Sequence, residues 1–123
     1  MPNQENPSSA KGWGYLVVWE FHVRPAQRNR FEQVYGPAGD WVRFFAQDSS
    51  YLGSELTRDL KTPGRYLTLD FWISEQAYRT FRERHQAEYQ AIDKRCEEMT
   101  ERETALGEFA RIILAAERPV PDE

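Results

Sequence analysis

The sequence has 123 residues, is 40% hydrophobic and 29% charged, and so fits one folded domain and excludes wholesale disorder. Its formal net charge of −4 predicts no basic surface for nucleic acid. No apolar run is long enough to cross a membrane, and the N-terminal residues lack the apolar core of a signal peptide, so we expect a cytoplasmic protein. The one cysteine, Cys96, cannot form an intrachain disulfide, which fits that compartment.

The polar, aperiodic residues 1–13 predict a disordered tail, and residues 115–123 predict a second one. Between them, residues 14–114 form the expected domain. Its first element is 15–23, a run of β-branched and aromatic residues that predicts a strand. Arg24-Pro25 ends this strand, because proline cannot donate to a sheet and suits the first turn of a helix.

Helical periodicity follows over residues 26–35 and again in a shorter stretch that starts at Asp40. Residues 51–60 alternate loosely and predict the second strand. The turn Thr62-Pro63-Gly64 then leads into 65–73, RYLTLDFWI, which is the strongest strand pattern in the chain.

Ser74 is the expected N-cap of the next helix. An apolar stripe at helical spacing continues from there, formed by Tyr78, Phe81, His85, Tyr89, Ile92, Cys96 and Met99. An unbroken helix over 75–100 would be about 40 Å long, more than a four-stranded domain needs, so we expect a break near 84–88. Residues 104–113 predict the last strand.

The two halves of the chain, 15–60 and 65–113, resemble each other weakly. Matches in the same order relate Glu20-Phe21 to Asp70-Phe71, Val23 to Ile73, Phe31 to Phe81, and Leu52-Gly53 to Leu106-Gly107. Two such halves give β-α-β-β-α-β, the ferredoxin-like α+β fold with a four-stranded antiparallel sheet. Right-handed crossovers are expected to place the first and third strands side by side and parallel at its centre.

Both central strands carry large apolar side chains at odd and at even positions. In this fold the helices cover only one face of the sheet, so the other face would be left as a large exposed apolar patch. The simplest cover is the same face of a second copy across a two-fold axis. We therefore expect a homodimer that packs through its sheet face.

The strand end LDFW, running into Ser74-Glu75-Gln76-Ala77-Tyr78, resembles the antibiotic biosynthesis monooxygenase (ABM) family. The resemblance covers residues 15–113 and implies the dimeric α+β barrel, in which two sheets pack face to face. It also implies a range of roles, because the families of this fold include cofactor-free oxygenases of aromatic polyketides, haem-degrading enzymes and proteins without an assigned activity.

The haem-degrading relatives use an asparagine on the first strand, and a tryptophan and a histidine on the second-half helix. Here Phe81 occupies the tryptophan position, and the first strand offers no asparagine but only Val18, Trp19 and Glu20. His85 lies four residues beyond Phe81, whereas the family spacing places the histidine near Gln90-Ala91-Ile92. We therefore do not expect haem degradation.

Parallel central strands would place Glu20 beside Asp70 and His22 beside Trp72, all on one face. Two close carboxylates do not both ionise freely, so the pKa of one would rise unless an arginine intervenes, and Arg58 and Arg65 are the nearest candidates in the sequence. One interpretation is a polar pocket with an acid–base group beside aromatic walls. The other, which we favour for the carboxylates, is a carboxylate–arginine network that fixes the dimer.

The candidate catalytic residues are His22, His85 and Asp70, and the candidate substrate-binding residues are Trp72, Tyr66, Trp19, Phe81 and Tyr89. The sequence has neither metal-ligand spacing nor a glycine-rich phosphate loop, so we expect no metal and no cofactor. The expected function is cofactor-independent monooxygenation of a small aromatic, polyketide-like substrate. The alternative is a non-catalytic dimeric module of the same fold that binds a ligand or is structural.

Overall fold

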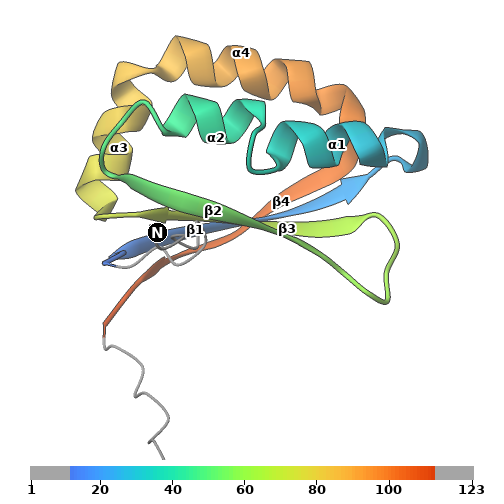
Figure 1. The fold of residues 1–123 in the computed structure, drawn as a ribbon, viewed down its shortest axis with the longest axis horizontal. Helices are drawn as coiled ribbons and strands as arrows, with labels where there is room; N and C mark the ends of the chain where they lie inside the picture. The colour runs from blue at the N-terminus through green and yellow to red at the C-terminus, as the bar shows by residue number, and fades with distance from the viewer. Residues whose placement is uncertain (1–11, 113–123) are drawn as a thin grey trace, which may run out of the picture.

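The computed structural model describes residues 12–112, which form a four-stranded sheet with helices on one face (Figure 1). In chain order the elements are β1 (Tyr15–Val23), the 3-10 helix η2 (Pro25–Gln27), α1 (Arg28–Tyr35), α2 (Asp40–Phe45), β2 (Tyr51–Arg58), β3 (Arg65–Trp72), α3 (Glu75–Arg84), α4 (Gln86–Cys96), the 3-10 helix η3 (Glu97–Met99) and β4 (Thr100–Ala110). This order confirms the predicted ferredoxin-like α+β fold. No helix within 12–112 is long and apolar enough to cross a membrane.

The strands are arranged in the order β2-β3-β1-β4, and every neighbouring pair is antiparallel. The central pair is β1 and β3, as predicted, but the prediction that these two strands are parallel is wrong. The crossover through α1 and α2 makes β2 run parallel to β1, and the short turn after β2 then reverses the chain. β3 therefore returns between them in the opposite direction.

The second helical region is divided where the sequence predicted. The Ser74 hydroxyl caps α3 by accepting a hydrogen bond from the Ala77 backbone N–H at 3.1 Å. α3 ends at Arg84, and α4 begins at Gln86 after the non-helical residue His85, which confirms the break expected near 84–88. The break lets two short helices, rather than one long rod, cover the sheet (Figure 1).

The ends of the strands differ slightly from the predicted ones. β2 and β3 stop two residues and one residue early, at Arg58 and Trp72, and β4 begins at Thr100, four residues earlier than predicted. The predicted tails fall almost wholly outside the described residues. Trp13, however, is described, and its ring meets that of Phe71 with centroids 5.5 Å apart.

The core is aromatic and lies between the sheet and the helices. Phe31 from α1, Phe81 from α3 and Trp72 from β3 are all 0% exposed. Phe31 and Phe81, which the internal repeat relates to each other, thus anchor the two helical regions in the same way. Phe21 and Tyr66 face each other across β1 and β3 and point to the same side. These contacts fix which side chains of the central strands face the helices.

The opposite side of the sheet, here called the open face, is covered by no helix or strand of residues 12–112 (Figure 1). The register of the strands assigns it an apolar patch made of Leu16, Val18, Leu67, Leu69, Phe71 and Phe109. Phe109 is 43% exposed, and the neighbouring Ile73 is 50% exposed. No helix or strand of residues 12–112 therefore covers the apolar side chains on this side of the sheet.

Candidate functional site

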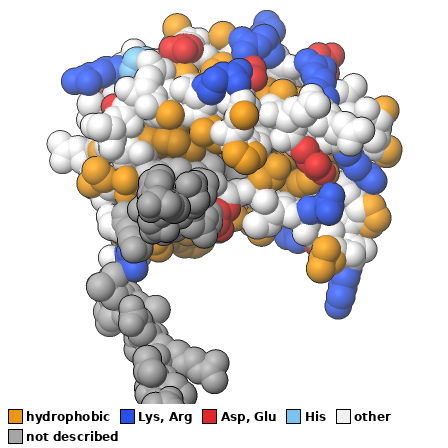
Figure 2. Space-filling view, in the orientation of Figure 1, with side chains coloured by type: hydrophobic (Ala, Val, Ile, Leu, Met, Phe, Trp, Pro, Cys, Tyr) orange, Lys and Arg blue, Asp and Glu red, His pale blue; other side chains and the backbone are white. Residues whose placement is uncertain are grey.

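A cavity of about 220 Å³ lies between the helices and the sheet. Its walls come from all four strands and from α1 to α4, and its lining includes Trp19, Phe21, Tyr35, Trp41, Phe45, Ser54, Thr68, Asp70, Arg82, Tyr89, Asp93 and Glu103. Hydrophobic side chains show between the helical layer and the sheet, while Lys and Arg lie mainly toward the rim (Figure 2). The cavity thus combines flat aromatic walls with a few ionisable groups, the usual composition of a small-molecule site.

Asp70 is the carboxylate on the sheet side of the cavity, held by two residues of β2. Gly53 has φ of 135°, and the β-bulge there shifts the register between Tyr51 and Gly53. The shift brings Tyr51 and Ser54, three residues apart, to the same side of the strand. Ser54 donates to the Asp70 carboxylate at 2.6 Å, and the Tyr51 hydroxyl lies 2.5 Å from the Ser54 hydroxyl.

Burial dominates the ionisation of Asp70. Loss of solvent raises its pKa to about 6, although the Ser54 hydrogen bond acts in the opposite direction. The sequence predicted a raised pKa for one of the two carboxyl groups of Glu20 and Asp70, and Asp70 is the one whose pKa is raised. The physical cause is burial, however, and not a neighbouring charge. A carboxylate with a pKa near 6 can exchange a proton near neutral pH.

Because of Asp70, the free energy of unfolding should fall as the pH rises from about 4 to 6. In the unfolded chain Asp70 ionises near its ordinary pKa of about 3.9, whereas the folded protein holds the proton to about pH 6. The folded state therefore bears a penalty, fully present above pH 6, of up to about 3 kcal/mol. We expect Asp70→Asn to gain about 1–3 kcal/mol of unfolding free energy relative to the unmodified protein at pH 8, but little at pH 4. Urea denaturation at both pH values measures this; equal differences at pH 4 and pH 8 would contradict it.

His22 does not reach this cavity. It lies on the open face, where its Nε2 is 2.9 Å from an Arg102 guanidinium nitrogen and 3.6 Å from the Glu20 carboxylate. Arg65 donates to Glu20 and also, at 2.9 Å, to Asp59. The Arg65 guanidinium, through its hydrogen bond, holds the pKa of Glu20 below its usual value. These five residues form a surface ion network at one end of the open face.

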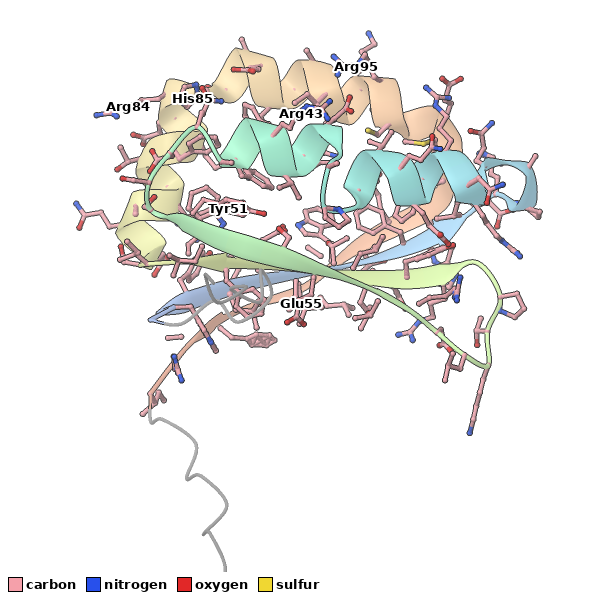
Figure 3. All side chains as sticks on the ribbon, viewed as in Figure 1. Arg43, Tyr51, Glu55, Arg84, His85 and Arg95 are labelled. Carbon is pink, nitrogen blue, oxygen red and sulfur yellow. The ribbon has the colours of Figure 1, made fainter. Side chains whose placement is uncertain are left out.

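His85 lies at the corner between α3 and α4 (Figure 3). Its ring packs against Phe81, with centroids 4.6 Å apart, and against Phe44 at 6.1 Å. Nδ1 is 3.8 Å from the carboxylate of Glu88, one turn along. The residue that interrupts the helix thus packs on the core from its edge and does not line the cavity.

The predicted pairs across the central strands are wrong for a geometric reason. In the antiparallel register Glu20 lies opposite Leu67 and His22 opposite Arg65. Asp70 lies opposite Val17, on the side that faces the helices, so Glu20 and Asp70 are on different faces of the sheet. No shared site of Glu20, His22, Asp70 and Trp72 exists.

Three of the eight predicted site residues line the cavity: Asp70, Trp19 and Tyr89. Trp72 and Phe81 are fully buried core residues, and Tyr66 donates to Glu32 at 2.5 Å on the other side of the core. The expectation that Trp72, Tyr66 and a histidine line one cavity is therefore wrong.

Sequence reasoning missed Trp41 and Arg82, which both line the cavity. Trp41 belongs to the periodic pattern of the short helix, which predicts core packing, and it is 8% exposed. Its indole N–H has no hydrogen-bond partner within the described part of the chain. Arg82 donates to the Tyr78 hydroxyl at 2.7 Å, and its guanidinium lies 3.6 Å from the centre of the Tyr89 ring. In residues 12–112 no group of three His, Cys, Asp or Glu is arranged to hold a metal ion.

Comparison with known proteins gives a family and a fold. The family model described as antibiotic biosynthesis monooxygenase matches residues 14–95. No curated protein sequence matches the chain. Among solved structures, a variant of SnoaB, a cofactor-independent oxygenase from Streptomyces nogalater, superposes with a TM-score of 0.65 at 20% identity, over 84% of this chain and 97% of that one.

Two further solved structures show how widely this fold is used. A conserved protein from Methanosarcina mazei has a TM-score of 0.62 at 13% identity, over 84% of this chain and 97% of its own. MhuD, a haem degrader from Mycobacterium tuberculosis with two haems in its active site, has a TM-score of 0.57 at 19% identity, over 83% and 99%. At such identities the likeness establishes the fold and not the chemistry.

Proposed function

Because the chain belongs to the antibiotic biosynthesis monooxygenase family, we propose that it is a cofactor-independent monooxygenase acting on a small aromatic substrate in the cavity beneath its helices. The observation that carries the proposal is Asp70, a partly buried carboxyl with a pKa of about 6 that lies in a cavity with aromatic walls. The description of SnoaB as a cofactor-independent oxygenase supports the same activity.

The proposed chemistry begins with removal of a proton. Ionised Asp70 takes a hydroxyl proton from an electron-rich hydroquinone, and the resulting anion transfers electrons to molecular oxygen. A ring carbon and one oxygen atom then join as a hydroperoxide, and loss of water from it leaves a carbonyl. In sum, a hydroquinone and O2 give a hydroxyquinone and water, so that four electrons pass from the ring to the two oxygen atoms.

The other cavity residues have supporting parts in this proposal. Ser54 and Tyr51 hold the Asp70 carboxylate in place through their hydrogen bonds. Trp41 contributes part of the aromatic wall of the cavity. Trp19 and Tyr89 offer flat faces for an aromatic ring.

Oxygen consumption tests the proposed function. We expect the purified protein to accelerate oxygen uptake by at least one member of a panel of substituted hydroquinones, faster above pH 6 than below it, because Asp70 must be ionised. With isotopically labelled oxygen gas, the product should gain one labelled atom and the other should appear in water. No acceleration across the panel, or release of hydrogen peroxide with an unlabelled quinone, would reject monooxygenation.

The alternative is a non-catalytic module that binds an aromatic ligand in the same cavity. The observation that favours it is the position of both histidines outside the cavity, which leaves Asp70 as the single candidate base of the three predicted. Saturable binding of an aromatic ligand without any oxygen uptake would support this alternative.

We also propose that the protein is a homodimer joined through the open face of its sheet. The support is the apolar patch of six side chains defined above, which no helix or strand of residues 12–112 covers, although the Trp13 ring packs on Phe71. The ion network around Glu20 and Arg65 lies at one end of this face and would border the interface. A two-fold axis would place identical patches against each other.

A further inference from the structure

The cavity has an unusual excess of negative charge. Four acidic residues line it, but Glu55 from β2 lies opposite the open-face residue Leu69, on the side of the sheet away from the helices (Figure 3). The other three are Asp70 from β3, Asp93 from α4 and Glu103 from β4, and Arg82 is the one lining residue with a positive charge among residues 12–112. Glu103 lies opposite Phe21 in the sheet, so its side chain shares the helix-facing side with that aromatic wall. Three different elements thus direct carboxylates toward one small volume.

These three carboxylates lack counter-ions. Within the described residues, none of them forms an ion pair with a lysine, arginine or histidine at 4.0 Å or less. Burial raises the pKa of Asp93 and of Glu103, and repulsion from Glu97 adds to both effects. Each group therefore carries a desolvation cost that an added cation would relieve.

Arg82 cannot supply all the missing charge. Its guanidinium stacks on the Tyr89 ring at 3.6 Å from the ring centre and donates to the Tyr78 hydroxyl at 2.7 Å. It lowers the pKa of Asp93, but its effect there is smaller than that of burial. The Arg82 guanidinium is thus held against the Tyr89 ring, and it forms no ion pair at 4.0 Å or less with Asp70, Asp93 or Glu103.

We propose that the cavity selects an aromatic ligand that carries a protonated amine, and discriminates against an aromatic carboxylate of the same size. The ammonium group would pair with Asp93 and Glu103, while the ring would lie against Trp19 and Trp41, whose faces also attract cations. A carboxylate would add like charge to a site already crowded with it. This inference rests on the proposed function only in taking the cavity as the ligand site.

Three probes with the same phenol ring test this charge preference: tyramine, 4-ethylphenol and 3-(4-hydroxyphenyl)propionate. They are cationic, neutral and anionic at pH 7.5. Titration calorimetry with the full-length protein should give tyramine a Kd about tenfold lower than that of 4-ethylphenol, as one partly buried ion pair allows. The propionate should bind most weakly of the three. Equal affinities, a preference for the propionate, or no binding of any probe at millimolar concentration would overturn the proposal.

A pair of matched variants locates the effect. Glu103→Gln should reduce the tyramine to 4-ethylphenol ratio about threefold or more, whereas Glu101→Gln, an exposed residue of the same strand outside the cavity, should leave it unchanged. An unchanged ratio in Glu103→Gln would contradict the assignment. Tyramine selectivity without any oxygen uptake would reject the oxygenase and keep this inference, and oxygen uptake without tyramine selectivity would do the reverse.

Discussion

Replacing Asp70 with asparagine is expected to slow oxygen uptake at least 10²-fold, the usual cost of losing a general base. Asparagine keeps the size of the side chain and can still accept the hydrogen bond from Ser54, so the cavity should keep its shape. Only the ability to take a proton is lost. Oxygen consumption above pH 6, at saturating hydroquinone, measures the effect.

The two histidines are the controls for this experiment. His22→Ala changes the open face and His85→Ala changes the helix corner, so each should reduce oxygen uptake by less than about threefold. Should His85→Ala abolish turnover while Asp70→Asn preserves half of it or more, the base would be His85. The role proposed for Asp70 would then be wrong.

A lysine in place of Leu69 is expected to convert the homodimer into monomers. Leu69 lies at the centre of the open face, between Val18 on β1 and Glu55 on β2. In the proposed dimer, two copies of the new charge would be buried close together near the two-fold axis. Burying an unpaired charge costs several kcal/mol, which strongly disfavours the dimer. Sedimentation at micromolar concentration should show the mass fall from twice 14.5 kDa to 14.5 kDa.

Gln33→Lys is the matched control, because Gln33 is exposed on α1, on the opposite side of the sheet. It adds the same charge and should leave the dimer intact. If the unmodified protein sediments at 14.5 kDa, the homodimer proposal fails directly. If Leu69→Lys remains a dimer, the interface lies elsewhere.

Local sequence patterns predicted most elements of the fold because each has a local physical cause. The Ser74 hydroxyl caps its helix within one turn, and His85 interrupts the helical stripe near the expected residues. The apolar runs around β1 and β3 made the central strands evident. The predicted end of β2 and the predicted start of β4 differ from the observed ones by two and four residues. Both are edge strands, and pairing with the neighbouring strand, rather than their own residues, decides where an edge strand ends.

The candidate site was harder to predict because it depends on which way each side chain faces. The internal repeat equated Glu20 with Asp70, but the structure places them on opposite faces of the sheet. A slip of one residue is enough to exchange the two faces of a strand. The internal repeat equated Val23 with Ile73. In the structure, however, the buried, helix-facing residues that end β1 and β3 are Val23 and Trp72, so the two halves correspond with an offset of one residue.

The closely packed aromatic core also makes the tryptophan fluorescence of the protein sensitive to ligand binding in the cavity. Trp41 and Tyr89 have ring centres 5.0 Å apart, and Trp72 lies 5.2 Å from Tyr51 and 5.3 Å from Tyr78. Over such distances, excitation absorbed by tyrosine passes to tryptophan, so ultraviolet emission of the folded chain comes mainly from its indoles. Trp19 and Trp41 line the cavity whereas Trp72 does not, so ligand occupancy alters the emission of the first two while Trp72 remains as an internal reference.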